Sequence, residues 1–288
     1  MLQKFFKYHG AGNDFILVDN RSGRLGLSGE QVKHICDRHT GFGADGLMLL
    51  EKSETKDFRM VYFNPDGSGG MMCGNGARCI ISFAADLGVV SGNFPVEFEA
   101  PDGSHTAVIL GKSKDPESKN PLRTIRLKMN DVPGVTVYPQ ENACFLDTGT
   151  RHLVRFVSAL ENYPVKEEGR ALRMDDRFAP GGTNVDFVEP VAGQAAAKGM
   201  LRIRTFERGV EGETLACGTG IVASAIAACF MGIERKALPD GRVSYDIKAA
   251  ISTLGVDFIP EGTGASFRAR DVWLTGPVAF VGTMECLL

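Results

Sequence analysis

The sequence predicts a two-domain α/β protein whose halves are pseudo-twofold copies of one unit. Three observations predict it: a length of 288 residues, an alternation of short apolar strands with two helices of small residues, and a C-G-x-G motif in each half. Hydrophobic residues make up 43% of the chain, which is enough for a sizeable core and argues against disorder.

The first half reads as strands and glycine loops around one helix of small residues. Lys4–Asp19 predicts a strand, a glycine loop and a second strand. Ser28 is a favourable N-cap for a helix over 29–38, and Cys73-Gly74-Asn75-Gly76 precedes a helix over 77–87. The polar stretch Lys112–Asn120 is interpreted as the first crossing between domains or as a surface loop before it. Further strands are expected over 47–51, 58–64, 96–99 and 106–110.

The second half has the same kind of organisation. Cys217-Gly218-Thr219-Gly220 precedes a helix of small and apolar residues over 221–231, which Gly232 closes. Strands are expected over 124–128, 143–146, 153–156, 185–188 and 201–206, and again from residue 242 to the end.

An internal repeat links the two halves. A shift of 144 residues, half of the chain, places Cys73 on Cys217 and Gly88 on Gly232. The same order of signals recurs: strand, loop, C-G-x-G, small-residue helix and capping glycine. This order favours a duplicated α/β unit over a chance similarity between two glycine-rich helix starts.

Charge and composition exclude several classes of protein. A net charge of -3, from 32 basic and 35 acidic residues, gives no basic surface for nucleic acid or anionic membrane. No run is long enough to span a bilayer, and Met1–Asp14 lacks the apolar stretch of a signal peptide. Seven cysteines without a CxxC pair indicate free thiols in a reducing compartment. We therefore expect a soluble, cytoplasmic protein without a metal centre.

Each C-G-x-G motif places a cysteine beside the first turn of a helix. The first N–H groups of a helix lack internal partners, and this end carries a partial positive charge. We therefore expect the pKa of each thiol to fall, so that the thiolate can act as a base near neutral pH. The glycines let the backbone approach a ligand and offer N–H groups to an anion. Two such sites suggest a cleft between the domains with one thiol on each side.

Two facing thiols suit the inversion of a carbon that carries a hydrogen. A thiolate removes the proton from one face while its partner thiol delivers a proton to the other, and the roles exchange with reaction direction. A substrate α-carboxylate between two helix ends would have its developing carbanion charge stabilised by fixed dipoles. No cofactor is expected, because no P-loop or pyridoxal-lysine signature stands out.

Five segments resemble motifs of the diaminopimelate epimerase family. Met72–Cys79 and Glu207–Gly220 resemble its two cysteine signatures, and the remaining three follow the family order over nearly the whole chain: His9–Phe15, Phe63–Ser68 and Gly182–Val185. The resemblance implies interconversion of LL- and meso-2,6-diaminopimelate in lysine and peptidoglycan precursor synthesis.

The same resemblance implies a domain arrangement. Each domain would be a mixed or antiparallel sheet wrapped around a central helix, with the active site in the cleft between the domains. The Cys73 domain would comprise 1–120 plus 277–288, and the Cys217 domain 121–276. The C-terminal strand, from about Pro277, would return to the first domain.

Carried over residue by residue, Cys73 and Cys217 would form the acid/base pair. The reacting α-carboxylate and amine would be cradled by Gly74, Asn75, Gly218 and Thr219. The distal end would be held by Asn13, Asn64, Asn184, Glu207 and Arg208. An arginine can grip a carboxylate through two parallel bonds, while glutamate and amide oxygens accept from an ammonium. A distal zwitterion needs this mixture, and a simple monoamino acid does not.

Two positions depart from the family pattern. Thr150-Arg151-His152 stands where the family usually has Asn-Pro-His, so Thr150 replaces an amide by a hydroxyl, and Thr150 and His152 are second-rank site residues. Gly46 stands where some relatives carry Gln. The sequence does not decide the oligomeric state or the extent of domain closure, and a homodimer is compatible with it.

Two further patterns in the sequence do not fit a nucleotide or metal site, and five cysteines fit a packing role. Gly41–Gly46 fits G-x-G-x-x-G but follows a helix and precedes a strand, the reverse of the dinucleotide fingerprint. His34, Cys36 and His39 do not share one helical face, which argues against a metal site. The cysteines expected to be ordinary packing residues are Cys36, Cys79, Cys144, Cys229 and Cys286.

Three rival functions stay open at this point. A proline-racemase-like enzyme for a simpler amino acid would use the same thiols but would not need the distal polar set. A thiol redox protein would join Cys73 to Cys217 in a disulfide. A non-catalytic amino-acid-binding protein would not need two thiols.

Overall fold

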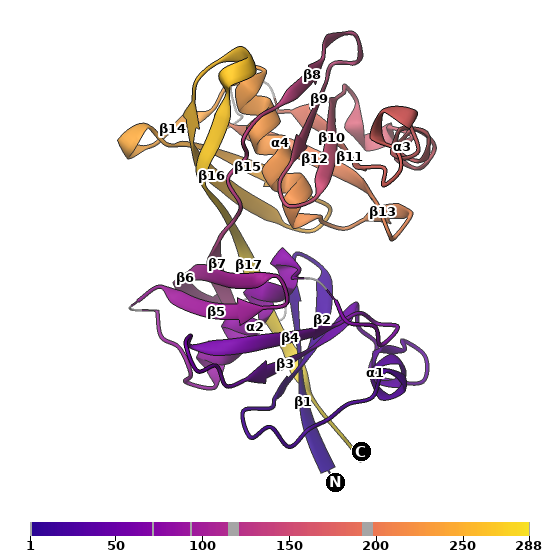
Figure 1. The fold of residues 1–288 in the computed structure, drawn as a ribbon, viewed down its shortest axis with the longest axis vertical. Helices are drawn as coiled ribbons and strands as arrows, with labels where there is room; N and C mark the ends of the chain where they lie inside the picture. Colours follow the sequence, from indigo (N-terminus) through magenta and orange to yellow (C-terminus); the bar gives the residue numbers. More distant parts are fainter. Residues whose placement is uncertain (1, 71, 93, 115–120, 192–197, 288) are drawn as a thin grey trace. The chain divides into compact units, whose positions relative to one another are not determined.

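The chain forms two compact units. The computed structural model describes residues 2–70, 72–92, 94–114, 121–191 and 198–287 (Figure 1). The first unit comprises Met1–Leu127 with Gly276–Leu288, and the second comprises Lys128–Thr275. Of the polar stretch Lys112–Asn120, residues 112–114 end a strand and 115–120 lie outside the described residues. The border predicted after residue 120 thus falls beside undescribed residues and stays a proposal.

In the first unit, strand pairings form a closed ring. Each strand pairs with the next along the chain, and the last returns to pair with the first. The β2–β3 and β4–β5 pairs are parallel and the others antiparallel. The strands are β1 (Leu2–Gly10), β2 (Asn13–Asp19), β3 (Gly46–Glu51), β4 (Phe58–Phe63), β5 (Val96–Ala100), β6 (Gly103–Lys114), β7 (Pro121–Lys128) and the C-terminal part of β17 (Arg268–Leu287).

The second unit repeats this series of pairings. The β10–β11 and β12–β15 pairs are parallel, and the pairs β8–β9, β9–β10, β11–β12, β15–β16 and β16–β17 are antiparallel. The strands are β8 (Thr136–Tyr138), β9 (Ala143–Asp147), β10 (Arg151–Phe156), β11 (Asn184–Pro190), β12 (Met200–Glu207), β15 (Val243–Lys248), β16 (Thr253–Glu261) and the N-terminal part of β17, with β13 (Gly212–Thr214) beside β12 and β14 (Lys236–Ala237) beside β15.

The helices occupy equivalent places in the two units. A parallel pair needs a crossover, and each of the four crossovers carries an α-helix. Helices α1 (Gly29–Cys36) and α3 (Val165–Arg173) make the first crossover of each unit, and α2 (Gly74–Asp86) and α4 (Gly218–Phe230) the second. The shared order of strands, pairings and helices confirms the duplicated α/β unit predicted from the sequence. The short 3-10 helices are Pro139–Glu141, Leu160–Asn162, Asp176–Phe178, Pro239–Gly241 and Gly264–Ser266.

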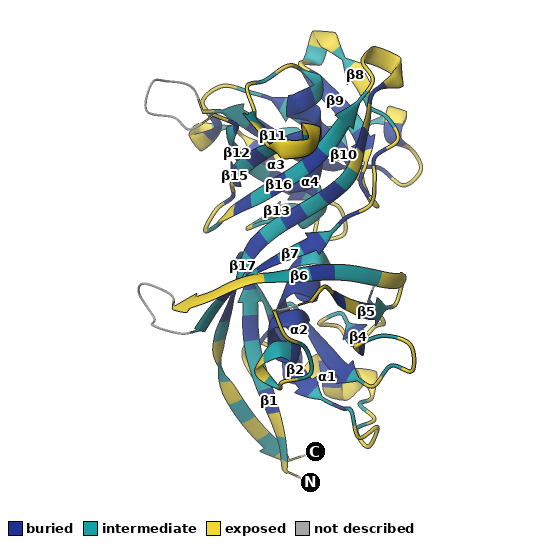
Figure 2. Cartoon of the chain, turned by 90° about the vertical axis from the view of Figure 1, so that its left-hand side faces the viewer, coloured by how far each residue is buried: buried dark blue, intermediate teal, exposed yellow. Residues whose placement is uncertain are grey.

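Helices α2 and α4 form the centre of their units. Helix α2 packs against β1, β2 and β3, and α4 against strands β9–β12, β15 and β16. The residues from 75 to 84 in α2 and from 220 to 229 in α4 are all buried. Strands β3 and β11 are buried along most of their length, whereas much of β17 alternates between buried and intermediate residues, which Figure 2 shows as colour bands. The expectation of a mixed sheet around a central helix is therefore confirmed for each unit.

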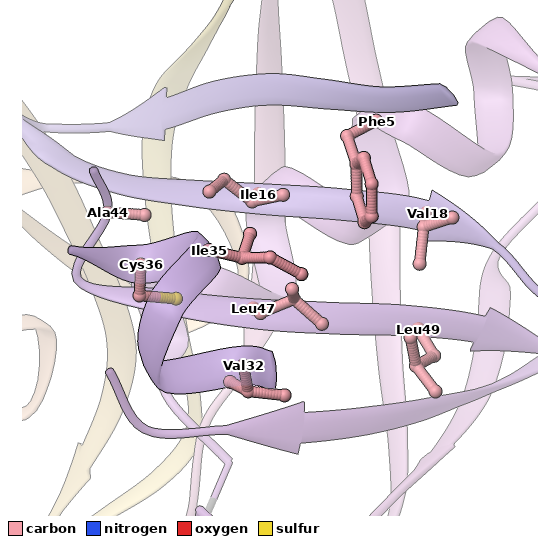
Figure 3. Packing of buried hydrophobic residues seen from close by; sticks show 9 residues of the cluster. All are labelled: Phe5, Ile16, Val18, Val32, Ile35, Cys36, Ala44, Leu47 and Leu49. Carbon is pink, nitrogen blue, oxygen red and sulfur yellow. The ribbon is translucent and has the colours of Figure 1, made fainter. Parts of the chain in front are cut away.

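The outer helices cover separate hydrophobic clusters. Figure 3 shows Val32 and Ile35 of α1 directed between strands β1, β2 and β3, where they meet Phe5, Ile16 and Leu47. In the second unit, Val165 at the start of α3 joins a corresponding cluster with Leu160, Val185, Phe187 and Phe206. Burying each such side chain stabilises the fold by about 1.5–3 kcal/mol.

Several predicted boundaries were wrong for local reasons. Helix α1 starts as predicted with a Ser28 capping box but ends at Cys36, because Asp37 is extended. Helices α2 and α4 begin three residues before the predicted starts, since their glycines adopt helical geometry. Helix α3 was not predicted, because its sequence is polar and interrupted by Gly169. In the described part of the chain, no helix has both the length and the apolar character to cross a membrane.

Candidate active site

Cys73 is the N-cap residue of α2. Its backbone is extended, and the helix proper begins at Gly74. The facing residue Asn13 is fixed by the turn between β1 and β2. Ala11 and Gly12 both have positive φ angles, 56° and 92°, and Gly10 pairs with Asn13 across this two-residue turn. Such a turn matches the twist of a hairpin, so Asn13 is held at the first position of β2.

Hydrogen bonds join Cys73 to two predicted site residues. The Sγ of Cys73 donates to Asn13 Oδ1 at 3.7 Å, and Asn75 Nδ2 donates to the same oxygen at 3.4 Å. Asn13 Nδ2 in turn donates to Asp45 Oδ2 at 2.5 Å. Gly74 is the first residue of the helix, so its N–H and that of Asn75 belong to the group that has no helical acceptor. These residues make up the first half-site.

Asn64 is placed differently from the other predicted residues of this unit. It follows β4, and its Nδ2 donates to Ser68 Oγ at 3.0 Å and Gly69 O at 3.4 Å. Its side chain therefore braces the loop before Cys73, and no described hydrogen bond links it to Asn13 or Asn75. At Gly46, an added Cβ would lie 2.6 Å from Tyr62 Cε2. The tyrosine ring thus fills the space in which a longer side chain at position 46 would begin.

Cys217 is the N-cap of α4, the position equivalent to Cys73. Its Sγ lies 3.3 Å from Thr219 Oγ1, and Thr219 Oγ1 lies 2.9 Å from His152 Nε2. The other ring nitrogen, His152 Nδ1, lies 2.7 Å from Asp186 Oδ2. A carboxylate only accepts, so the Nδ1 N–H donates to Asp186, while Nε2 lies within hydrogen-bond distance of the Thr219 hydroxyl. The chain Asp186–His152–Thr219–Cys217 is the second half-site.

Asp186 was not predicted as a site residue. It is fully buried with His152, and Thr205 Oγ1 donates to its Oδ1 at 2.7 Å. Gly220 leaves it room, since a Cβ there would lie 2.4 Å from Asp186 Oδ1. The sequence signal was a charged residue among Val185, Phe187 and other apolar residues of one strand, because a buried charge needs a partner.

The remaining predicted residues of this unit surround the same chain. Thr150 Oγ1 donates to Thr219 Oγ1 at 3.0 Å and lies 2.9 Å from His152 Nε2. Asn184 Oδ1 accepts from the backbone N–H of Arg208 at 2.8 Å, which ties β11 to the end of β12. The Arg208 side chain is exposed, and Glu207 Oε2 accepts from Thr214 Oγ1 at 2.8 Å. Gly218 is the first residue of α4.

The surroundings of Cys217 raise its pKa although it stands at a helix start. Burial raises this pKa well above its usual value, and the negative charges of Glu207 and Asp186 raise it further. Hydrogen bonds from Thr219 and the Gly220 backbone lower it, as expected at a helix start, but they do not outweigh burial. The expectation of a lowered pKa at both cysteines was therefore wrong for Cys217, because it neglected the desolvation of the thiolate.

The other cysteines match the packing role predicted for them. All seven cysteines are free, and four of the five lie buried outside the half-sites. Burial raises the pKa of Cys36 and Cys144 to about 11 and raises the pKa of Cys79 and Cys229 as well. Cys286 is half-buried against the cluster beneath α1. No group of three or more His, Cys, Asp or Glu side chains in the described ranges is arranged to hold a metal ion.

The fold places the chain in a structural class that includes a hydroxyproline epimerase. A hydroxyproline epimerase structure from Agrobacterium vitis has a TM-score of 0.64 and 16% identity, covering 100% of this chain and 93% of that one. A phenazine biosynthesis protein of the PhzF family from Bacillus anthracis has a TM-score of 0.69 and 15% identity over 100% of both chains. These likenesses show the shared fold.

Within this class, the chain belongs to the diaminopimelate epimerase family. The family model matches residues 5–114 and 144–250, which include both half-sites. A diaminopimelate epimerase from Flavobacterium psychrophilum is 42% identical over 96% of this chain and 98% of its own length. One from Chlorobaculum tepidum is 45% identical over 77% of this chain and 82% of its own. The resemblance of the five motifs is thereby confirmed at the level of the family.

Proposed function

We propose that this protein interconverts LL- and meso-2,6-diaminopimelate without a cofactor, with Cys73 and Cys217 as a paired base and acid. The observation that carries the proposal is the equivalence of these cysteines: each is the N-cap of the buried central helix in one copy of a duplicated unit. Inversion at carbon requires two proton-transferring groups, and the duplication supplies two of the same kind.

In this mechanism, the thiolate of one cysteine removes the α-proton and the thiol of the other protonates the opposite face. The reverse reaction exchanges their roles. The first N–H groups of α2 and α4, at Gly74, Asn75, Gly218 and Thr219, would bind the α-carboxylate and stabilise the charge that develops beside it. On the Cys217 side, the Thr219 hydroxyl is held by His152 and orients the thiol.

The substrate is proposed from its second amino-acid end. Asn13, Asn64, Asn184, Glu207 and Arg208 offer the amide, carboxylate and guanidinium groups that a distal zwitterion requires. Arg208 is suited to a carboxylate because its guanidinium is exposed while its backbone is anchored by Asn184. A proline-like substrate has no second amino-acid end for these groups to bind.

The proposal includes two domains, 1–120 with 277–288 and 121–276, that enclose the substrate in a cleft. Closure would protect the carbanion from protonation by water. It also includes a cytoplasmic, reducing environment, because oxidation of Cys73 and Cys217 to a disulfide would remove both proton carriers. A homodimer is compatible with this mechanism but is not required by it, since each chain carries both cysteines.

The test is incubation of the full chain with LL-diaminopimelate in heavy water under reducing conditions without added cofactor. We expect deuterium at one α-carbon and formation of the meso isomer, followed by mass spectrometry and chiral chromatography. Cys73→Ala and Cys217→Ala should each abolish epimerisation. The matched controls Cys79→Ala and Cys229→Ala remove buried thiols from the same two helices and should retain it.

Three outcomes would contradict the proposal. Absence of exchange in the reduced wild-type protein would exclude the activity. Exchange that survives Cys217→Ala unchanged would exclude the two-thiol mechanism. Racemisation of proline at a rate similar to that of diaminopimelate would favour the simpler amino-acid racemase instead.

A further inference from the structure

The middle of helix α2 contains a buried cation that no part of the proposed mechanism uses. Arg78 is 0% exposed and lies one turn beyond Cys73. Its Nη2 donates to Asn75 Oδ1 at 2.7 Å, its Nη1 donates to Gly74 O at 3.2 Å, and its Nε has no partner. Across the residues that the structure describes, no carboxylate forms an ion pair with it. A buried charge without a counterion is costly, so its retention requires a reason.

The internal duplication allows Arg78 to be compared with the equivalent position of the second unit. The shift of 144 residues that aligns Cys73 with Cys217 aligns Arg78 with Val222, which is also fully buried. At the Cys217 half-site, the equivalent position is thus apolar, and among its described residues the buried acidic group is Asp186. The two half-sites share their backbone geometry but carry buried charges of opposite sign.

We propose that Arg78 is a positioning residue of the Cys73 half-site, where it stabilises the thiolate form of Cys73 and orients the amides of Asn75 and Asn13. The inference rests on the proposed function, which gives the Cys73 thiolate its task as a base. It assigns to the sequence segment Ala77-Arg78-Cys79 a role beyond helix packing.

Geometry explains the orientation of the two amides. A guanidinium only donates, so Asn75 must direct its Oδ1 towards Arg78, and its Nδ2 then donates to Asn13 Oδ1. Asp45 only accepts, so it holds Asn13 Nδ2 on the other side. The orientation of both amides is thus fixed by Arg78, which only donates, and by Asp45, which only accepts. Asn13 Oδ1 is left facing Cys73 Sγ.

Room for the guanidinium is provided by the glycine that ends β1. A Cβ at Gly10 would lie 3.1 Å from Asn75 O, 3.4 Å from Arg78 Nη2 and 3.5 Å from Cys79 Sγ. The guanidinium is therefore packed beneath the loop that carries Asn13. In this low-dielectric setting a charge acts more strongly on its neighbours than it would in water.

The other charges around this half-site compensate one another. Asp14 on β2 pairs with Lys7 of β1 at 2.9 Å and with Arg38 at 2.7 Å, and Asp45 pairs with Arg38 at 2.7 Å. Cys79 on α2 is neutral at pH 7, because burial raises its pKa. Burial lowers the pKa of Arg78, and its electrostatic interactions with Cys79 and Cys73 partly offset this lowering.

The test is the pH dependence of Cys73 alkylation by iodoacetamide, followed by peptide mass spectrometry on the full chain. In Arg78→Met, we expect the midpoint to move up and the rate at pH 7 to fall about tenfold or more, since a rise of one pH unit in the midpoint reduces the thiolate fraction tenfold. Arg78→Lys keeps a charge and should retain most of the rate. Epimerisation by Arg78→Met should recover as the pH is raised towards 9, which a packing defect would not produce.

A matched control is available at the opposite end of α2. Arg123 is also buried, but it pairs with Asp86 at 2.8 Å and donates to Ser82 O at 3.0 Å. Arg123→Met should reduce stability without moving the Cys73 profile. An unmoved profile in folded Arg78→Met, or an equal shift in Arg123→Met, would overturn the inference.

A second measurement needs no variant, so it applies even if Arg78→Met does not fold. In the wild-type protein, the rate of labelling by anionic iodoacetate relative to neutral iodoacetamide should be higher at Cys73 than at Cys217, because the buried charges differ in sign. Equal ratios at the two cysteines would contradict the inference. Neither labelling experiment requires a substrate, so a wild-type protein that fails to epimerise diaminopimelate overturns the proposed function separately.

Discussion

The repeat-equivalent glycines Gly76 and Gly220 provide a sharp test of the buried charge in the second unit. An added Cβ at Gly220 would lie 2.4 Å from Asp186 Oδ1 and 3.0 Å from its Cγ. Asp186 cannot move away freely, because His152 and Thr205 hold it from two sides at 2.7 Å. We therefore expect Gly220→Ala to displace the carboxylate and break at least one of these hydrogen bonds.

The magnitude follows from three contributions. Overpacking costs about 1–3 kcal/mol, and loss of a hydrogen bond to a charged group costs about 1.5–3 kcal/mol. Alanine recovers about 0.5–1 kcal/mol relative to glycine inside a helix. Gly220→Ala should thus lower the free energy of unfolding by about 1.5–5.5 kcal/mol. It should also reduce epimerisation, because Asp186 begins the hydrogen-bonded chain that ends at Cys217.

Gly76→Ala is the matched control in the first unit. A Cβ at Gly76 would lie 3.3 Å from Met48 Sδ and 3.5 Å from Phe15 Cζ, and the flexible methionine can adjust. Its unfolding free energy should stay within about 1 kcal/mol of the wild-type value. Unfolding in urea can be followed by circular dichroism for both variants, and Trp273, the single tryptophan of the chain, reports on the second unit. A Gly220→Ala protein as stable as Gly76→Ala would refute the reasoning.

Three further predictions concern titration and thiol reactivity. Asp186→Asn should lower the pH at which Cys217 is alkylated, because burial, Glu207 and Asp186 raise the Cys217 pKa and one of these anions is removed; an upward shift would count against this reading. Burial raises the pKa of Asp14, but Arg38 and Lys7 together lower it to about 2. Asp14 therefore contributes stability that is present above its unfolded pKa of about 3.9 and is lost as the pH falls towards 2. Arg38→Met should flatten this part of the stability curve, which urea unfolding at pH 3 and pH 6 can measure; parallel curves would exclude the link. Burial raises the pKa of four other cysteines, namely Cys36, Cys79, Cys144 and Cys229. Iodoacetamide should therefore label Cys73 before these four. Simultaneous labelling would show that the fold opens readily.

Local sequence signals were sufficient for the elements that carry strong periodicity or caps. The alternating apolar strands, the Ser28 capping box and the duplicated C-G-x-G helices could all be identified without tertiary information. Helix α3 escaped because its apolar face is narrow, with Val165 and Gly169 buried and Leu172 partly buried among polar residues. The starts of α2 and α4 were misplaced because glycine was interpreted as a loop residue where it forms the first helical turn.

By itself, the sequence determined the family, the duplicated α/β architecture and the two cysteines with their neighbouring glycines, because these depend on residue types at fixed spacings. Tertiary structure alone decided the electrostatics of each half-site. Arg78 and Asp186 each stand among apolar residues in the sequence, but only packing shows that one lies beside Asn75 and the other beside His152. Burial and charge depend on what surrounds a side chain in space, which is why the helix-end argument, made from sequence, predicted the wrong direction for the Cys217 pKa.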